Sequence, residues 1–292
     1  MSTLQAALSG ALIGGLYTLM AAGLSVTWGV LRVINLTHFA MILLGAYLSF
    51  QLTTSWGIDP VLTVAITAPL LFVLGAALQW VFDRLAIAEL NSLLLTFGLL
   101  VIATQAVSEI WTANFQQLPA GANPYATRSL SLGRLVFPVS TLLAFGFALV
   151  VVGGAHLALR RTFAGRAMRA FAADRPVAAA FGVDHRRLGM LLAGLAAASA
   201  AVAGMLFALA NSLTPATAYE WFGIVFAVVI LGGVGQVVGT MLAGVLVGVL
   251  SGVVSAVLSP SAVPFVLFSA IVLALLVRPQ GLFAGLGAGA AG

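Results

Sequence analysis

The amino-acid sequence predicts an all-α fold, a polytopic transmembrane helical bundle of about nine spans (8–10) that includes discontinuous helices. Hydrophobic residues fill 62% of the 292 positions and charged residues only 7%, whereas a soluble domain carries roughly 25% charged residues. Apolar runs of about 20 residues recur, and that length crosses a hydrocarbon core of roughly 30 Å. The runs are continuous, as over 225–231, so they lack the alternation typical of strands in a membrane barrel.

Charged and turn-forming residues mark where the predicted spans end. Arg32 follows the first span, Asp59-Pro60 turns the chain after the second, and Asp83-Arg84 ends the third. A polar stretch over 114–134 separates the fourth span from the fifth, and Ser259-Pro260 precedes the last. In order, we expect two helices over about 4–30 and 39–56 and a third that ends at about 82. Further helices are expected over 91–111, 135–159, 188–210, 221–231 and 237–258, and a last one ends at Arg278.

Two breaks interrupt the apolar pattern. The first break, Asn35-Leu36-Thr37-His38, places polar groups between the first two helices. The second, which we call the glycine break, contains Gly232, Gly233 and Gly235 and follows an apolar run too short for a full span. We therefore expect a discontinuous or tilted helix there, as in transporters whose unwound backbone lines a cavity.

The segment 160–187 differs from the rest of the chain because its charges belong in water or among lipid headgroups. It holds seven arginines against two aspartates, a balance of +5 that equals the net charge of the whole protein. One arginine at the centre of a membrane helix costs roughly 2.5–3.5 kcal/mol, so seven would cost on the order of 20 kcal/mol. Charge alone leaves two interpretations open: a loop that fixes topology and binds anionic lipid, or a docking surface for another protein.

Arginine placement also predicts the orientation of the chain. Positive charge in short loops marks the cytoplasmic side of a membrane protein. With 160–187 placed inside, Arg32, Arg84 and Arg278 fall inside too, and only Arg128 and Arg134 remain outside. The N-terminus is then expected outside and the C-terminus in the cytoplasm.

Several activities are excluded by residues that the sequence lacks or scatters. Cysteine is absent, and the three histidines at 38, 156 and 185 do not form a zinc signature. Lysine is also absent, and because the phosphate-binding loop of an ATPase requires lysine, any ATP hydrolysis must come from another polypeptide. We therefore expect no metal and no cofactor in this chain, no nucleic-acid partner, and no enzyme activity.

The acidic residues bear on how transport would be driven. Residues Glu89, Glu109 and Glu220 fall near predicted helix ends, and none lies clearly in mid-span. An ion-coupled secondary transporter of small solutes, the alternative function, would favour acidic residues within its spans. The sequence therefore weighs against that alternative.

Several short motifs together resemble the permease family of branched-chain amino acid ABC importers, over nearly the whole chain. One departure is Phe39, where the family usually places glycine after the histidine. The motifs that carry the resemblance are Gly15-Leu16-Tyr17-Thr18-Leu19, Gly23-Leu24, Asn35-Leu36-Thr37-His38, Gly45-Ala46-Tyr47, Gly165-Arg166-Ala167-Met168-Arg169-Ala170, Asp174-Arg175, Phe181-Gly182-Val183, Gly232-Gly233-Val234-Gly235 and Arg278-Pro279-Gln280-Gly281-Leu282-Phe283.

This resemblance implies a single permease domain over 1–292 that translocates branched-chain or other small amino acids by alternating access, in a bacterial inner membrane. It implies two ATP-binding cassette ATPase subunits that use the ATP, a second homologous permease, an extracytoplasmic solute-binding protein and membrane lipid as partners. The loop 160–187 would couple to the ATPases through one short helix bounded by glycines. Its expected coupling residues are Gly165, Arg166, Arg169, Asp174, Arg175 and Gly182.

The two breaks are the predicted translocation path, and each has a plainer interpretation. Asn35 and His38 are polar groups of the kind that mark a pathway in a membrane. Alternatively, Asn35 caps the second helix and His38 lies at the headgroup level. Gly232, Gly233 and Gly235 either line the path or let helices pack closely.

Overall fold

The computed structural model describes residues 3–85, 89–133 and 135–283. It confirms the predicted helical bundle. The two ends of the bundle along its long axis differ in structure. Eight described segments are long and apolar enough to cross a membrane. The ninth apolar helix, α10, has only 16 residues and at 1.5 Å per residue is about 24 Å long. The apolar helices are α1 (Thr3–Leu31), α2 (Thr37–Trp56), α3 (Val64–Arg84), α4 (Glu89–Trp111), α6 (Val139–Arg161), α9 (His185–Ala210), α10 (Thr217–Gly232), α11 (Val237–Val257) and α12 (Val263–Val277), the last preceded by the short turn η1 (Pro260–Ala262).

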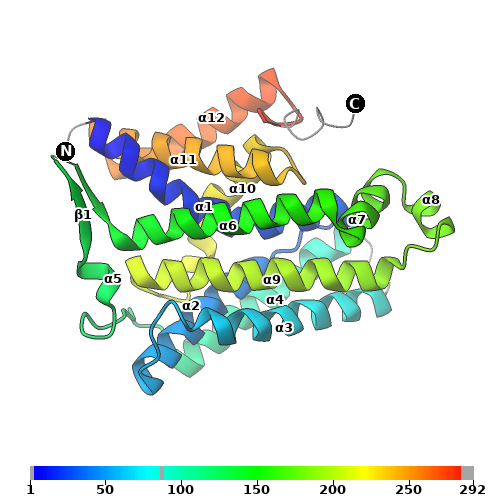
Figure 1. Ribbon diagram of the computed structural model, residues 1–292, viewed down its shortest axis with the longest axis horizontal. Helices are drawn as coiled ribbons and strands as arrows, with labels where there is room; N and C mark the ends of the chain where they lie inside the picture. The colour runs from blue at the N-terminus through cyan, green and yellow to red at the C-terminus, as the bar shows by residue number, and fades with distance from the viewer. Residues whose placement is uncertain (1–2, 86–88, 134, 284–292) are drawn as a thin grey trace.

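The two ends of the bundle carry different extramembrane elements (Figure 1). Helix α5 (Pro124–Thr127) and strands β1 (Ser129–Leu132) and β2 (Leu135–Pro138) lie at the end where α1 begins. Helices α7 (Phe163–Ala173) and α8 (Arg175–Ala180) lie at the opposite end, where α6 ends and α9 begins. The arginine-rich loop is therefore separated from the β-hairpin by the length of the bundle.

The packing of the bundle depends on α1, which touches most of the other long helices. Its closest partner is α11, and the two meet through glycines on both sides. A Cβ built at Gly14 would stand 2.5 Å from the carbonyl oxygen of Gly244, and one at Gly248 would stand 2.2 Å from that of Gly10. Such backbone contact is possible only without side chains, and it strengthens dispersion attraction between helices in lipid.

The predicted start of the fifth helix was wrong. Residues 135–138 form strand β2, which pairs antiparallel with β1, and α6 begins only at Val139. The hairpin turns at Gly133, whose φ of +63° suits glycine. The side chain of Gln5 holds the hairpin to α1, because its Nε2 donates to the carbonyl of Val136 at 2.6 Å. Arg134, expected on the outer side, falls outside the described residues.

Candidate functional site

The loop predicted to form one helix contains two, which we call the α7–α8 segment (residues 163–180). Thr162 begins α7 by accepting the N–H of Gly165 on its hydroxyl at 3.0 Å. Asp174 ends α7 and caps α8, since its carboxylate accepts the N–H of Val177 at 3.0 Å. The single-helix prediction was wrong because Pro176 has no N–H and its ring would clash with a carbonyl one turn earlier.

The two glycines expected to bound this helix have different roles. Gly165 lies inside α7 and rests on the end of α6, where a Cβ would stand only 2.3 Å from the carbonyl oxygen of Ala158. Gly182 follows α8 and has a φ of +83°, so it turns the chain toward α9. Gly165 therefore sets the distance between α7 and α6, and Gly182 sets the exit from α8.

One face of the α7–α8 segment is buried against the bundle. The apolar side chains on this face pack against the last turn of α1 and the first turns of α9, and all of them are less than 10% exposed. The cluster consists of Met168, Phe171 and Ala178 with Val30, Leu31, Leu188 and Leu192. Burial of this face holds the segment at a fixed place on the bundle.

Two arginines fasten the segment to the end of α1 from opposite directions. Arg175, from α8, donates through Nη2 to the carbonyl of Leu31, and its guanidinium lies 5.1 Å from the ring centroid of Phe171. Arg32, just after α1, donates to the carbonyl of Ala172 at 3.5 Å. The carbonyls at the end of a helix lack intrahelical partners and attract cations. Arg175 thus faces the bundle and is half-buried.

The other face of the segment is exposed and mixes basic with apolar groups. Arg166 and Arg169 are exposed, and so are the large apolar side chains of Phe163 (79%) and of Phe181 (85%), which directly follows the segment. Exposed aromatic side chains beside arginines are the composition typical of protein interfaces. Of the predicted coupling residues, only Arg166, Arg169 and Asp174 are thus exposed with a charge.

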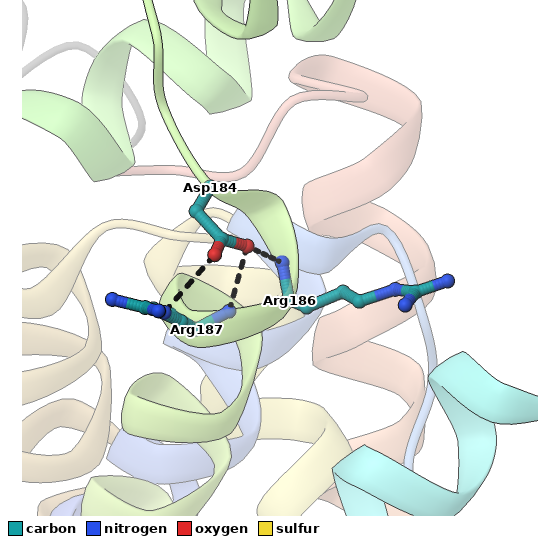
Figure 2. A network of polar contacts seen from close by, with 3 residues as sticks. All are labelled: Asp184, Arg186 and Arg187. Atoms are coloured by element: carbon teal, nitrogen blue, oxygen red, sulfur yellow. Dashed lines mark hydrogen bonds and ion pairs between the residues drawn. The ribbon is translucent and has the colours of Figure 1, made fainter.

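The link from the segment into α9 is fixed by Asp184 (Figure 2). Its Oδ1 accepts the N–H groups of Arg186 at 3.0 Å and Arg187 at 3.2 Å, and its Oδ2 lies 3.1 Å from Nε of Arg187. The backbone hydrogen bond from Arg187 is the main reason why the pKa of Asp184 lies below its ordinary value. Figure 2 shows the Arg186 side chain pointing away from this carboxylate.

The first break contains a polar turn, formed by Asn35 and Thr37, and a buried histidine, His38. Asn35 accepts the N–H of Thr37 on its side-chain oxygen at 3.0 Å, and the Thr37 hydroxyl donates to the same atom. This geometry satisfies a free N–H at the start of α2. The ring of His38 is 4% exposed and places Nε2 2.9 Å from the carbonyl oxygen of Met20.

The depth of this histidine follows from its partner. Met20 lies about 16 Å along α1 from the end at Leu31, counting 1.5 Å per residue. His38 is therefore buried inside the helical bundle, well away from the end of α1. A cavity of ≈ 20 Å³ lined by Asn35, Thr37 and His38 adjoins it, which is room for about one water molecule.

The glycine break is packed against α1. Gly233 and Gly235 have φ values of +85° and +81°, which other residues rarely adopt. The N–H of Gly235 donates to the carbonyl of Ser25 at 3.0 Å, and a Cβ on Gly29 would stand 2.3 Å from the Cα of Gly235. The geometry of these glycines is that of close packing, and their place on a translocation path stays a prediction.

The chain segment after α12 supports the same break, a contact that the sequence did not reveal. The N–H of Leu282 donates to the carbonyl of Leu231 at 2.9 Å. Gly281 has a φ of +99°, and a Cβ there would stand 2.6 Å from the carbonyl oxygen of Ile230. The only signal was that Gly281 and Leu282 belong to one motif of the family resemblance and that Leu231 directly precedes another. The residues after α12 thus complete the hydrogen bonding at the end of α10.

The hairpin end of the bundle has a polar contact that was also missed. The hydroxyl of Tyr125, in α5, lies 2.9 Å and 3.1 Å from the two carboxylate oxygens of Asp59. Partial burial, followed by the hydrogen bond and charge of Asp59, raises the pKa of Tyr125. The amide of Asn123 donates to the carbonyl of Leu209 at 2.9 Å. These bonds hold α5 across the ends of α2 and α9.

The described residues form nine apolar helices with a basic helix pair anchored at one end, which is the architecture of a polytopic membrane protein. Residues 6–278 match the family described as branched-chain amino acid transport system, permease component. The chain therefore belongs to this family, as the sequence motifs indicated, and it is a permease subunit.

Relatives from bacteria and an archaeon match most of the chain. The chain is 29% identical over 294 residues to the high-affinity branched-chain amino acid transport system permease protein LivH of Escherichia coli K12, covering 96% of this chain and 94% of the relative. It is 26% identical over 295 residues to the corresponding permease protein BraD of Pseudomonas aeruginosa, covering 96% and 95%. A probable LivH of Methanocaldococcus jannaschii is 27% identical over 241 residues, covering 80% and 75%. No solved structure matches the chain.

Proposed function

We propose that this permease carries branched-chain or other small amino acids across a bacterial inner membrane by alternating access, driven by ATP hydrolysis in two partner ATPase subunits. A second homologous permease and an extracytoplasmic solute-binding protein complete the transporter. The α7–α8 segment then faces the cytoplasm, and the N-terminus and the hairpin face outward. The substrate class follows that of LivH and BraD, which are branched-chain amino acid permeases.

The observation that carries the proposal is the two-sided build of the α7–α8 segment. Its exposed side presents Arg166 and Arg169 with Phe163, and the exposed Phe181 directly follows it, a surface suited to a protein partner. Its buried side is fastened to α1 through Arg175. A partner that grips the exposed side can therefore move α1, because the link between them is made of packed side chains and hydrogen bonds.

Helix α1 connects the segment to both parts of the proposed path. It touches His38 at Met20 and the glycine break at Ser25 and Gly29. Asn35 and His38, with the small cavity beside them, would line the path. Gly232, Gly233 and Gly235 would serve as the hinge that lets α10 tilt, since positive φ values and absent side chains lower the cost of rotation there.

The distribution of acidic residues favours ATP over an ion gradient as the energy source. Among the carboxylates whose side chains the structure describes, none lies in the middle of a span. Asp83 and Glu109 lie in the last turns of α3 and α4, and Glu220 lies in the first turn of α10. A proton relay through the bundle would require carboxylates further inside.

The test is uptake of radiolabelled leucine by proteoliposomes that contain the chain with its partner subunits. The double variant Arg166→Glu plus Arg169→Glu reverses the charge of the exposed face without touching its buried anchor. We expect it to insert normally but to lose ATP-driven uptake, whereas Arg128→Glu, at the hairpin end, keeps uptake. Uptake that persists without the ATPases and collapses with the proton gradient would establish the secondary carrier instead.

A further inference from the structure

A second and larger cavity lies where the α7–α8 segment meets the bundle. Its volume is ≈ 160 Å³, and its walls come from the ends of α1 and α3 and the first turns of α4 and α9, together with α7 and α8. The polar part of its lining is Gln79, Asp83, Ser92, Arg175 and His185. None of these residues except Arg175 belongs to the proposed coupling or translocation sets, so the cavity is a separate feature.

The carboxylate of Asp83 gives the cavity a site for a cationic group. Its Oδ1 accepts a hydrogen bond from Nε2 of Gln79 at 2.9 Å. Its Oδ2 is buried and has no hydrogen-bond partner among the described residues. A buried carboxylate oxygen without a donor is unfavourable, and a ligand ammonium would supply the donor. Gly189 lies beside this oxygen, because a Cβ there would stand 3.8 Å from Oδ2, at an ordinary contact distance.

The same cavity also presents basic groups and apolar walls. Arg175 and His185 line it together with Asp83. A guanidinium is the side-chain group best matched to a carboxylate in shape and charge. Phe82 and Phe171 supply apolar surface between these polar groups. A simple cation or a simple anion would meet repulsion from one charge in this cavity, whereas a zwitterion would be attracted by both.

We propose that this cavity binds a free α-amino acid with a small apolar side chain, a regulatory site for the cargo class. The inference rests on the proposed function for the orientation that places the cavity on the cytoplasmic side. The ligand ammonium meets Asp83 and Gln79, the carboxylate meets His185 on the Arg175 side, and the apolar side chain meets Phe82 and Phe171.

Occupation of the cavity inhibits transport because of where its walls come from. The ligand touches α3 and α9 of the bundle and α7 and α8 of the segment at the same time. Alternating access requires the segment to move relative to the bundle. A ligand that fits only the present arrangement stabilises it and slows the cycle, so internal amino acid limits its own import.

The test uses proteoliposomes of the complete transporter that enclose ATP and a chosen concentration of unlabelled leucine on the α7–α8 side. Initial uptake of labelled leucine should fall about tenfold when internal leucine reaches about nine times its dissociation constant, by the factor 1 + [L]/Kd. Internal 4-methylpentanoate, which lacks the ammonium, and 3-methylbutylamine, which lacks the carboxylate, should leave uptake unchanged at the same concentration.

Two variants locate the effect in this cavity. Gly189→Ala adds a methyl group beside Asp83 at ordinary contact distances of 3.5–3.8 Å, so it fills space without disturbing the fold. Asp83→Asn removes the charge and keeps the shape, and serves if the first variant is poorly made. Both should keep normal uptake without internal leucine, and both should need at least tenfold more internal leucine for half-inhibition.

Three results would overturn the inference. Uptake by the wild type that ignores internal leucine, variants as sensitive as the wild type, or equal inhibition by the two singly charged analogues each rule out a zwitterion site here. In all three, ATP-driven uptake itself persists and the proposed function stands. Absence of ATP-driven uptake from liposomes without internal leucine refutes the proposed function, and with it the ground on which this inference rests.

Discussion

The glycine seam between α1 and α11 allows a quantitative test of the packing. In Gly248→Ala the new Cβ would stand 2.2 Å from the carbonyl oxygen of Gly10 and 2.7 Å from the backbone nitrogen of Gly14. Ordinary contacts at a Cβ are 3.4–4 Å, so the two helices must separate by about 1 Å. Because both neighbours are backbone atoms, no side chain can rotate away. Overpacking of this kind costs about 1–3 kcal/mol.

A matched control removes the effect of helix propensity from this estimate. Alanine is better than glycine in a helix by about 0.8–1 kcal/mol, a gain that Gly248→Ala shares with Gly146→Ala in α6. Nothing lies within 4 Å of a Cβ at Gly146. The difference between the two variants is therefore the overpacking itself, and a central value of about 2 kcal/mol corresponds to a Tm difference of about 4–8 °C.

The measurement is thermal unfolding followed by tryptophan fluorescence, in one detergent and at one scan rate, since membrane proteins often unfold irreversibly. We expect Gly146→Ala to melt at or slightly above the wild type and Gly248→Ala to melt several degrees below Gly146→Ala. Equal melting temperatures for the two variants would refute the close approach of α1 and α11.

Three further predictions concern the ends of the bundle. In Asp184→Ala the Tm should fall at pH 7, and the difference in Tm from the wild type should narrow as the pH drops below about 4. The reason is that a carboxylate whose pKa is lowered in the folded state stabilises the fold fully only above its unfolded pKa. A Tm difference that does not depend on pH would contradict this role. Tyr125→Phe removes the hydroxyl bonded to Asp59, a bond worth about 0.5–1 kcal/mol at this partly buried place. Proteolysis of the 112–123 connection should then quicken about 2- to 5-fold, whereas an unchanged rate would show that the bond does not hold α5. Gly281→Ala places a Cβ 2.6 Å from the Ile230 carbonyl oxygen at a φ of +99°, so it should cost about 1–3 kcal/mol. Residues 278–283 should then be cut faster in limited proteolysis, and a rate equal to the wild type would argue against the contact.

The bundle could be predicted from the sequence because lipid imposes a simple rule on it. Long apolar runs and arginines at their ends mark spans whatever their tertiary partners are. The hairpin was missed because Leu135-Val136-Phe137 is apolar both as a strand and as the start of a helix. Only Pro138, which cannot continue a ladder of hydrogen bonds, marks where the strand ends.

The candidate site was predicted in position but not in geometry. The alanine-rich composition of 165–182 favoured one helix, and Pro176 was the available sign that it divides. The resemblance identified Arg175 without saying that it faces the bundle. Its bond to Leu31 joins residues 144 positions apart, and Arg32 reaches Ala172 over 140 positions. No local pattern carries such pairings, because they depend on how α1 and α8 meet in space.

The contacts of α1 give a physical reason why short, scattered motifs resemble one family. Three of these motifs contain a residue that touches this helix: His38 at Met20, Gly235 at Ser25, and Arg175 at Leu31. The contacts lie within the last 12 residues of a continuous 29-residue helix, over about 16 Å. A shift of α1 caused at the α7–α8 segment must therefore act on the first break and the glycine break together. That shared helix, rather than direct contact among the motifs, is what would make them move as one unit.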